Sequence, residues 1–108
     1  MLDNLKAALD STGLPFVHFA WSADAAQLQT DHGVWAEDSE RSLYANNVHA
    51  ERIRQGMIHW FTRSDDSPAP LAIEAALDAA SIPWHLDGVD FEEDTGFLHY
   101  VWIFEAVD

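Results

Sequence analysis

The chain has 108 residues, with 19 acidic and 5 basic side chains and a formal net charge of −14 at pH 7. This length suffices for one domain with its own core, and we expect residues 1–108 to form that single domain. The absence of cysteine excludes disulfide bonds, thiolate metal sites and cysteine nucleophiles. Nucleic acids and anionic membranes bind proteins through basic groups, so the excess of carboxylates disfavours both kinds of partner.

The N-terminal segment has no basic region followed by a long apolar run, and no stretch has the length and apolarity of a membrane span. We therefore expect a protein that is made and kept in a cytoplasm. The acidity is compatible with solubility alone. It is equally compatible with a basic partner, a DNA-mimicking surface, or a surface that DNA passes without sticking.

The first half of the chain predicts one helix and two strands. Leucines at helical spacing predict a short amphipathic helix over residues 2–11, with Gly13 as its C-terminal stop. An apolar run predicts a first strand over residues 16–21. A polar connection over residues 23–32 leads to a second, short strand over residues 33–37.

A long polar connection is expected over residues 38–50, and such loops in small domains are more often functional than accidental. Residues 51–63 then predict a long strand. Residues 68–80 predict an Ala-rich helix, with Ser67 as its cap and Pro68 in its first turn. One stripe of this helix is apolar, which suits packing against a sheet.

The C-terminal segment predicts a β-hairpin whose loop, residues 93–96, ends at Gly96. In this register Glu92 faces Phe97, Phe91 faces Leu98, Val89 faces Tyr100 and Asp90 faces His99. Leu86 and Trp84 are then out of phase, and a β-bulge at Asp87-Gly88 restores them opposite Trp102 and Phe104. We expect an aromatic face to hold the helices, made of Trp84, Phe91, Tyr100, Trp102 and Phe104.

The element order is therefore α-β-β-β-α-β-β. It predicts an α+β fold, with a small, mostly antiparallel curved sheet and two helices packed on it.

No catalytic or metal site stands out in the sequence. No two of the six histidines are four residues apart, and their spacing does not match a metal-ligand pattern. The run Glu92-Glu93-Asp94 lacks the alternating ligands of a calcium loop. No phosphate-binding loop or nucleophile elbow is present. We expect no enzymatic activity, no metal and no cofactor.

The basic residues suggest a candidate interface. Four of them lie in the middle of the chain: Arg41, Arg52, Arg54 and Arg63. They could pair with the acidic surface of a neighbouring copy. The acidic hairpin tip, Glu92, Glu93 and Asp94, is free to meet a neighbouring subunit or to line a channel. Alternatively, they pair within the monomer or sit on a solvated strand face. We take the subunit or partner interface to include Arg41, Tyr44, Asn46, Asn47 and Arg52.

Three segments resemble one family. They are Tyr44-Ala45-Asn46-Asn47-Val48-His49-Ala50-Glu51-Arg52, the strand ending Trp60-Phe61-Thr62-Arg63, and residues 82–105 from Ile82-Pro83-Trp84 to Trp102-Ile103-Phe104-Glu105. Together they resemble the tail-completion or tail-terminator (head–tail joining) proteins of long-tailed phages and prophages. The resemblance follows the element order over most of the chain and is strongest in residues 44–63 and 82–105.

This resemblance implies a virion structural protein with a small α+β domain, a curved sheet and two helices. Its copies would form a ring, typically a hexamer, at the head-proximal end of the phage tail tube. The ring would end tube polymerisation and join the tail to the head connector. It would be assembled in the host bacterial cytoplasm, and DNA would pass through its lumen without specific binding. The alternative from the residues alone is an acidic inhibitor, immunity protein or DNA mimic that binds a basic partner.

Overall fold

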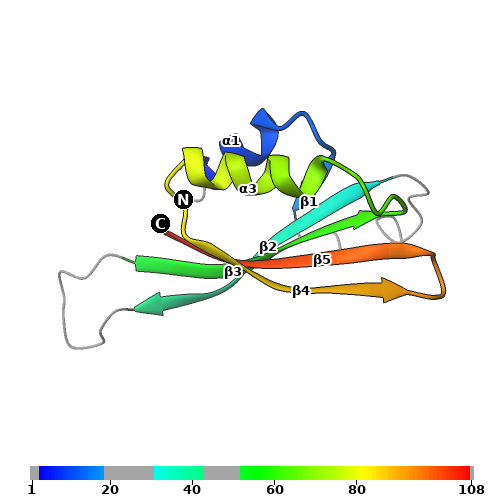
Figure 1. The fold of residues 1–108 in the computed structure, drawn as a ribbon. Coiled ribbons are helices and arrows are strands. Elements are labelled where there is room, and N and C mark those ends of the chain that lie inside the picture. Colours follow the sequence, from blue (N-terminus) through cyan, green and yellow to red (C-terminus); the bar gives the residue numbers. More distant parts are fainter. Residues whose placement is uncertain (1–2, 19–30, 43–51, 108) are drawn as a thin grey trace.

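The computed structural model describes residues 3–18, 31–42 and 52–107, with the side chains of 38–42, 52–54 and 107 outside that description. Two helices and five strands lie within these described residues (Figure 1). In order they are α1 (Asp3–Ser11), β1 (Phe16–His18), β2 (His32–Ser42), β3 (Arg52–Thr62), α3 (Ala69–Ala79), β4 (Trp84–Glu92) and β5 (Phe97–Val107). The predicted α+β class and the order α-β-β-β-α-β-β are confirmed.

The five strands form one open sheet in the order β1-β2-β3-β5-β4. β1 runs parallel to β2, and the other three pairs are antiparallel. Both helices lie on the same side of the sheet (Figure 1). Asn4 of α1 donates from Nδ2 to the carbonyl of Ala80 just after α3, over 3.4 Å. No helix in the described ranges has the length and apolarity needed to cross a membrane.

The core fills the space between the helices and the sheet. Its largest apolar side chains are almost completely buried: Leu5, Leu9, Ile58, Trp60, Ile73, Leu77, Trp102 and Phe104. Each contributes roughly 2–3 kcal/mol by leaving water. Two indole groups tie α3 to the sheet, because Trp102 Nε1 donates to Glu74 Oε2 over 2.9 Å and Trp84 Nε1 donates to Asp78 Oδ1 over 2.8 Å.

The predicted register of the C-terminal hairpin is confirmed at every position. Glu92 faces Phe97 and Phe91 faces Leu98 at the turn, and the register shifts between Leu86 and Gly88, where the bulge was expected. Beyond the bulge, Leu86 faces Trp102. Gly96 closes the turn with φ of 78°, a value that glycine adopts without steric cost.

Several expectations for the elements were wrong in detail. The polar connection expected over residues 38–50 begins later, because β2 continues to Ser42 past a bulge between Glu37 and Ser39. Polar residues in this part of β2 are tolerated because the ladder to β3 supplies the backbone hydrogen bonds. The N-cap of α3 is Pro68 and has no side-chain cap bond, although Ser67 Oγ accepts a hydrogen bond from the Ala69 N–H over 3.2 Å.

The aromatic face of the hairpin was also only partly right. Trp102 and Phe104 are fully buried, and Trp84 and Tyr100 pack against the core. Phe91 does not hold the helices, because 61% of it is exposed. It lies on the same sheet face as Trp84, but at the far end of β4.

Candidate functional site

The expected interface residues fall at two opposite ends of the sheet. Arg41 pairs with Ile53 in the β2–β3 ladder, and Ser42 pairs with Arg52, which brings the two arginines to neighbouring positions at one end. Tyr44, Asn46 and Asn47 lie outside the described residues. The turn that carries Glu92, Glu93 and Asp94 lies at the other end of the sheet (Figure 1).

The distance between the two ends follows from the register of β5. Ile53 pairs with Val107 and Thr62 pairs with Leu98, so β5 runs from the acidic turn to the arginine end. At about 3.3 Å per residue, the two ends are roughly 30 Å apart. Within one copy, the acidic turn is therefore far from Arg41 and Arg52.

Arg63 does not join the other arginines. Its guanidinium lies 4.2 Å from the centre of the Phe97 ring, and its Nε donates to the carbonyl oxygen of Thr95 over 3.2 Å. Its backbone N–H donates to Asp31 Oδ1 over 3.3 Å. This arginine helps to fix the acidic turn within the monomer. For Arg63, the alternative of contacts inside one copy therefore applies.

The acidic turn has an ordered hydrogen-bond pattern. The N–H of Gly96 donates to the Glu92 carbonyl over 2.8 Å. The Thr95 hydroxyl donates to Glu92 Oε1 over 3.2 Å and accepts from the Phe97 N–H over 3.2 Å. Glu93 and Asp94 are exposed at the tip. The turn therefore holds Glu92 in place and presents the next two carboxylates to solvent.

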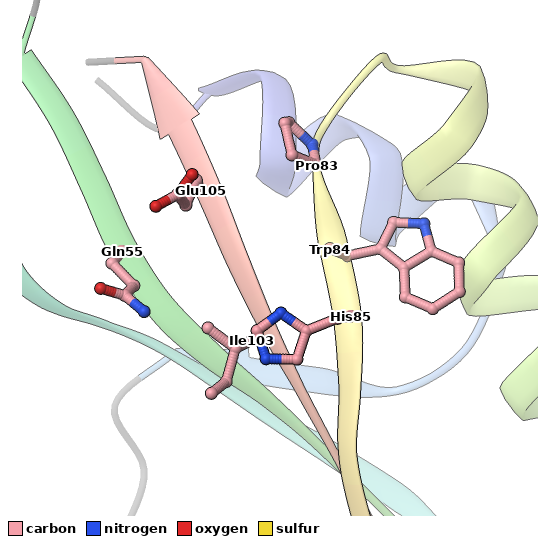
Figure 2. A pocket seen from close by; sticks show the side chains of 6 residues that line it. All are labelled: Gln55, Pro83, Trp84, His85, Ile103 and Glu105. Atoms are coloured by element: carbon pink, nitrogen blue, oxygen red, sulfur yellow. The ribbon is translucent and has the colours of Figure 1, made fainter.

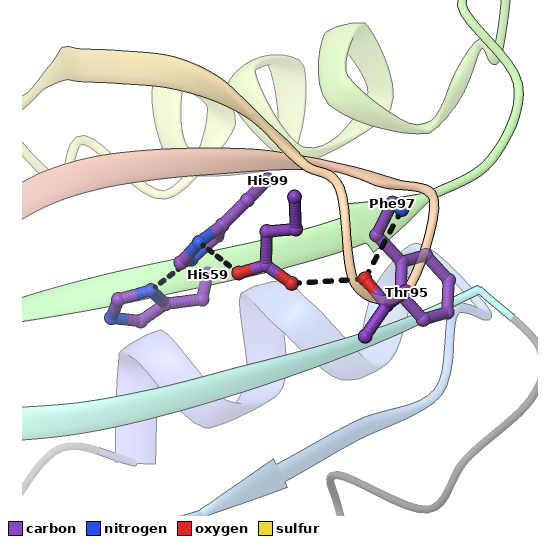
Figure 3. Close-up of polar contacts among 5 residues, drawn as sticks. His59, Thr95, Phe97 and His99 are labelled. Atoms are coloured by element: carbon purple, nitrogen blue, oxygen red, sulfur yellow. Dashed lines mark hydrogen bonds and ion pairs between the residues drawn. The ribbon is translucent and has the colours of Figure 1, made fainter.

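A pair of histidines extends from this turn across the sheet face opposite the helices. His59 Nδ1 lies 2.6 Å from His99 Nε2, and His99 Nδ1 lies 3.1 Å from Glu92 Oε2 (Figure 3). The two imidazoles come from β3 and β5, where His99 pairs with Phe61 and His59 with Val101. A carboxylate and two imidazoles thus form one chain of polar contacts.

The protonation of this chain is constrained by its geometry. A hydrogen bond between two imidazole nitrogens needs one donor and one acceptor, so at least one ring is neutral. Burial, together with the nearby His99, lowers the pKa of His59 from 6.5 to about 4. His59 is therefore neutral at ordinary pH.

Aromatic rings surround the two histidines. The Phe61 ring stacks with two imidazoles. Its centroid lies 4.3 Å from that of His99 and 4.8 Å from that of His32. Phe97 meets Phe61 edge-on at 6.0 Å. With only 8% of His59 exposed, this row forms a packed polar and aromatic layer in which a substrate has little access to the histidine.

A shallow pocket of about 200 Å³ lies elsewhere on the sheet, and its lining is Gln55, Pro83, Trp84, His85, Ile103 and Glu105 (Figure 2). Trp84 points toward α3, whereas His85 points toward Ile103 (Figure 2). The volume is smaller than that of typical small-molecule sites, about 300–1,000 Å³. The lining contains neither His59 nor His99, so the pocket and the histidine chain do not form one site.

Metal binding was also assessed from the geometry of the possible ligands. Within residues 3–18, 31–42 and 52–107, no group of three or more histidine, aspartate or glutamate side chains is arranged to hold a metal ion. The polar contacts instead join Glu92 to His99 and His99 to His59, one pair after the other.

Comparisons with known proteins assign no family to the chain. No protein-family model matches the sequence, and no curated protein matches it either.

The sequence alone did not predict the histidine chain. The hairpin register gave the position of His99 opposite Asp90, but the pairing of β3 with β5 joins segments about 40 residues apart in the chain. A signal was present in the alternation of His59, Phe61 and Arg63 on one face of a strand. It becomes informative only when the neighbouring strand is known.

Proposed function

We propose that this protein is a phage tail terminator, or tail-completion protein, that forms a ring at the head-proximal end of the tail tube. The ring ends tube polymerisation and joins the tail to the head connector. The proposal starts from the resemblance of residues 44–63 and 82–105 to this class. The small α+β domain with two helices that the resemblance implies is the fold that the chain adopts, which supports the proposal.

The observation that carries the proposal furthest is the separation of the two expected interface regions. The molecule is elongated, with principal extents of 47 × 27 × 21 Å. Arg41 and Arg52 are at one end of the sheet and the Glu92–Asp94 turn is at the other. Unlike patches at opposite ends favour head-to-tail contacts, which close into rings when the rotation between copies permits it.

The charge of the chain also supports a channel. With a net charge of −14 per copy, a ring of several copies would repel the phosphates of passing DNA at close range. The partners of this ring are then further copies of the chain, the tail tube protein and the connector protein. DNA is cargo that passes without specific binding.

The alternative, an acidic inhibitor or DNA mimic, predicts carboxylates gathered on one face. Exposed carboxylates instead lie on both layers of the fold: Asp3 and Asp10 on α1, and Asp87 and Asp90 on β4. This distribution is less consistent with a single phosphate-like array.

Charge reversal tests the proposed contact. The R41E/R52E and E93R/D94R variants should each fail to assemble by themselves, whereas their equimolar mixture should assemble, because each unlike pair of ends is then restored. The measurement is native mass spectrometry with light scattering across a concentration series. Lys6→Glu on α1, which belongs to neither proposed contact region, is the charge-reversal control and should assemble like the unmodified protein.

Ring assembly on a partner is tested separately by binding to purified tail tubes and connector rings. The proposal is overturned if the unmodified protein stays monomeric at high concentration and also fails to bind both partners. A tight one-to-one complex with a nuclease or DNA-binding protein would instead support the inhibitor.

A further inference from the structure

β4 forms one edge of the sheet and is poorly covered by the helices. The large apolar residues that are clearly exposed in the described ranges include three from this one strand: Leu86 at 44%, Val89 at 43% and Phe91 at 61%. Their partners across the ladder are Trp102, Tyr100 and Leu98. All three therefore lie on the same sheet face as the helices, which cover this face over the inner strands.

α3 adds a fourth apolar residue to this surface. Leu71, which is 72% exposed, lies one helical turn before Glu74 and two turns before Asp78. Glu74 and Asp78 accept hydrogen bonds from the indoles of β5 and β4, so this stripe of α3 faces the β4 edge. We call Leu71, Leu86, Val89 and Phe91 together the β4 edge surface.

The other face of β4 is acidic. Asp90 pairs with His99 and is exposed, and Asp87 is exposed at the bulge. The edge strand is thus apolar toward the helix side and negatively charged toward the opposite side. An added strand of matching character would alternate apolar and basic residues.

A second copy of the chain does not match this requirement. If two β4 edges paired, Asp87 and Asp90 of both copies would come together, and like charges across a strand pair are destabilising. β2 is paired with β1 only at Gly33–Trp35 among the described residues, and beyond Trp35 its sequence runs Ala36-Glu37-Asp38-Ser39-Glu40-Arg41, which does not alternate apolar and basic residues. The opposite edge strand, β1, has only three residues, Phe16–His18, and no lysine or arginine.

Two of the arginines lie on an inner strand that has no free edge. Arg52 and Arg54 lie on β3, which pairs with β2 on one side and with β5 on the other. Within the described ranges, no edge strand of a second copy alternates apolar residues with lysines or arginines, which favours a segment of another protein at the β4 edge.

We infer that β4 binds an extended segment of a different protein as a sixth strand, with apolar side chains on the β4 edge surface and lysines or arginines facing Asp87 and Asp90. Backbone hydrogen bonds along the edge supply affinity in such strand additions, and alternate side chains supply specificity. The acidic face and the bulge hinder pairing with further copies of the chain. Charged residues and bulges on edge strands commonly have this effect in soluble proteins. This inference does not depend on ring formation.

The test uses the full chain and two synthetic nonapeptides of the same composition. In one peptide valine and lysine alternate; in the other, the valines and lysines form two separate blocks. The alternating peptide should bind at least about tenfold more tightly by calorimetry. It should also slow hydrogen exchange of β4 amides, with no change at β1. Equal affinities, or protection at β1 instead of β4, would overturn the inference.

Matched variants test the surface directly. Val89→Ser should weaken binding of the alternating peptide about tenfold. Val17→Ser should leave binding unchanged, because Val17 is similarly exposed, at 38%, but lies on the opposite edge strand. Phe91→Ser replaces Val89→Ser if the latter fails to fold. Equal effects of the β4 and β1 variants, or self-association that Val89→Ser abolishes, would contradict a foreign strand as the occupant. The assembly assays for the ring contain no peptide, whereas the strand-addition assays measure peptide binding. A negative result in one set of assays therefore does not affect the other proposal.

Discussion

The imidazoles of His59 and His99 meet at 2.6 Å in the middle of the sheet face opposite the helices. They join β3 to β5, and Glu92 continues the contact into the acidic turn. Because His59 is almost completely buried, a proton added to its ring would place a charge between two central strands where water cannot solvate it. This relationship makes the stability of the fold sensitive to pH.

Stability should decrease as the pH falls from 7 to 5. The pKa of His59 is about 4 in the folded chain, against 6.5 when the ring is free, so the unfolded chain binds the extra proton below pH 6.5. Below that pH the free energy of unfolding falls, by up to about 2–3 kcal/mol near pH 4. Urea denaturation at a series of pH values measures this slope.

The control for this pH dependence is a substitution of the histidine itself. His59→Phe should flatten the slope between pH 7 and pH 5, whereas the exposed His85→Asn should leave it unchanged. If His59→Phe retains the full slope, other groups are responsible for it.

Gly56→Ala should destabilise the protein by roughly 1–3 kcal/mol or more. A Cβ at this position would lie 2.2 Å from the carbonyl oxygen of Ala36 and 2.7 Å from Phe104 Cζ. The backbone of β2 would have to move, because the added Cβ would also lie 2.8 Å from Glu37 Cα, the residue paired with Gly56. Gly88→Ala is the matched control, because no atom lies within 4 Å of its added Cβ. Thermal unfolding of both variants provides the comparison, and equal midpoints would contradict the packing argument.

The two phenylalanines of the hairpin should differ greatly in their contribution to stability. Phe104→Ala removes a fully buried ring and should cost about 3–5 kcal/mol. Phe91→Ala removes a ring that is 61% exposed and should change the free energy of unfolding by less than about 0.5 kcal/mol. Denaturant titration decides between this expectation and a core role for Phe91, which would give a loss of similar size for both variants.

Deleting Asp87 should preserve the hairpin register. The bulge lies between Leu86 and Gly88, so removing the extra residue keeps Leu86 opposite Trp102 and Val89 opposite Tyr100. Deleting Asp90 should instead destabilise the protein, because Val89 would move to the other sheet face, and Leu86 and Trp84 would keep their partners only if the bulge were lost. Near-ultraviolet circular dichroism reports the packing of the tryptophans in both variants. An Asp90 deletion with the tryptophan packing and stability of the Asp87 deletion would show that the register is not fixed by the apolar face.

The sequence by itself determined the local features of this protein. It specified the element order, the hairpin turn at Gly96 and the bulge before Gly88, because side chains alternate with a period of two and glycine permits a positive φ. Only the tertiary structure decided which strands are neighbours. The pairing of β3 with β5 buried His59 against His99 and separated Arg63 from Arg41 and Arg52. The placement of the helices left Phe91 exposed. These outcomes depend on contacts between segments far apart in the chain. The alternation of side chains within one strand does not show which strand pairs with it or which helix covers it.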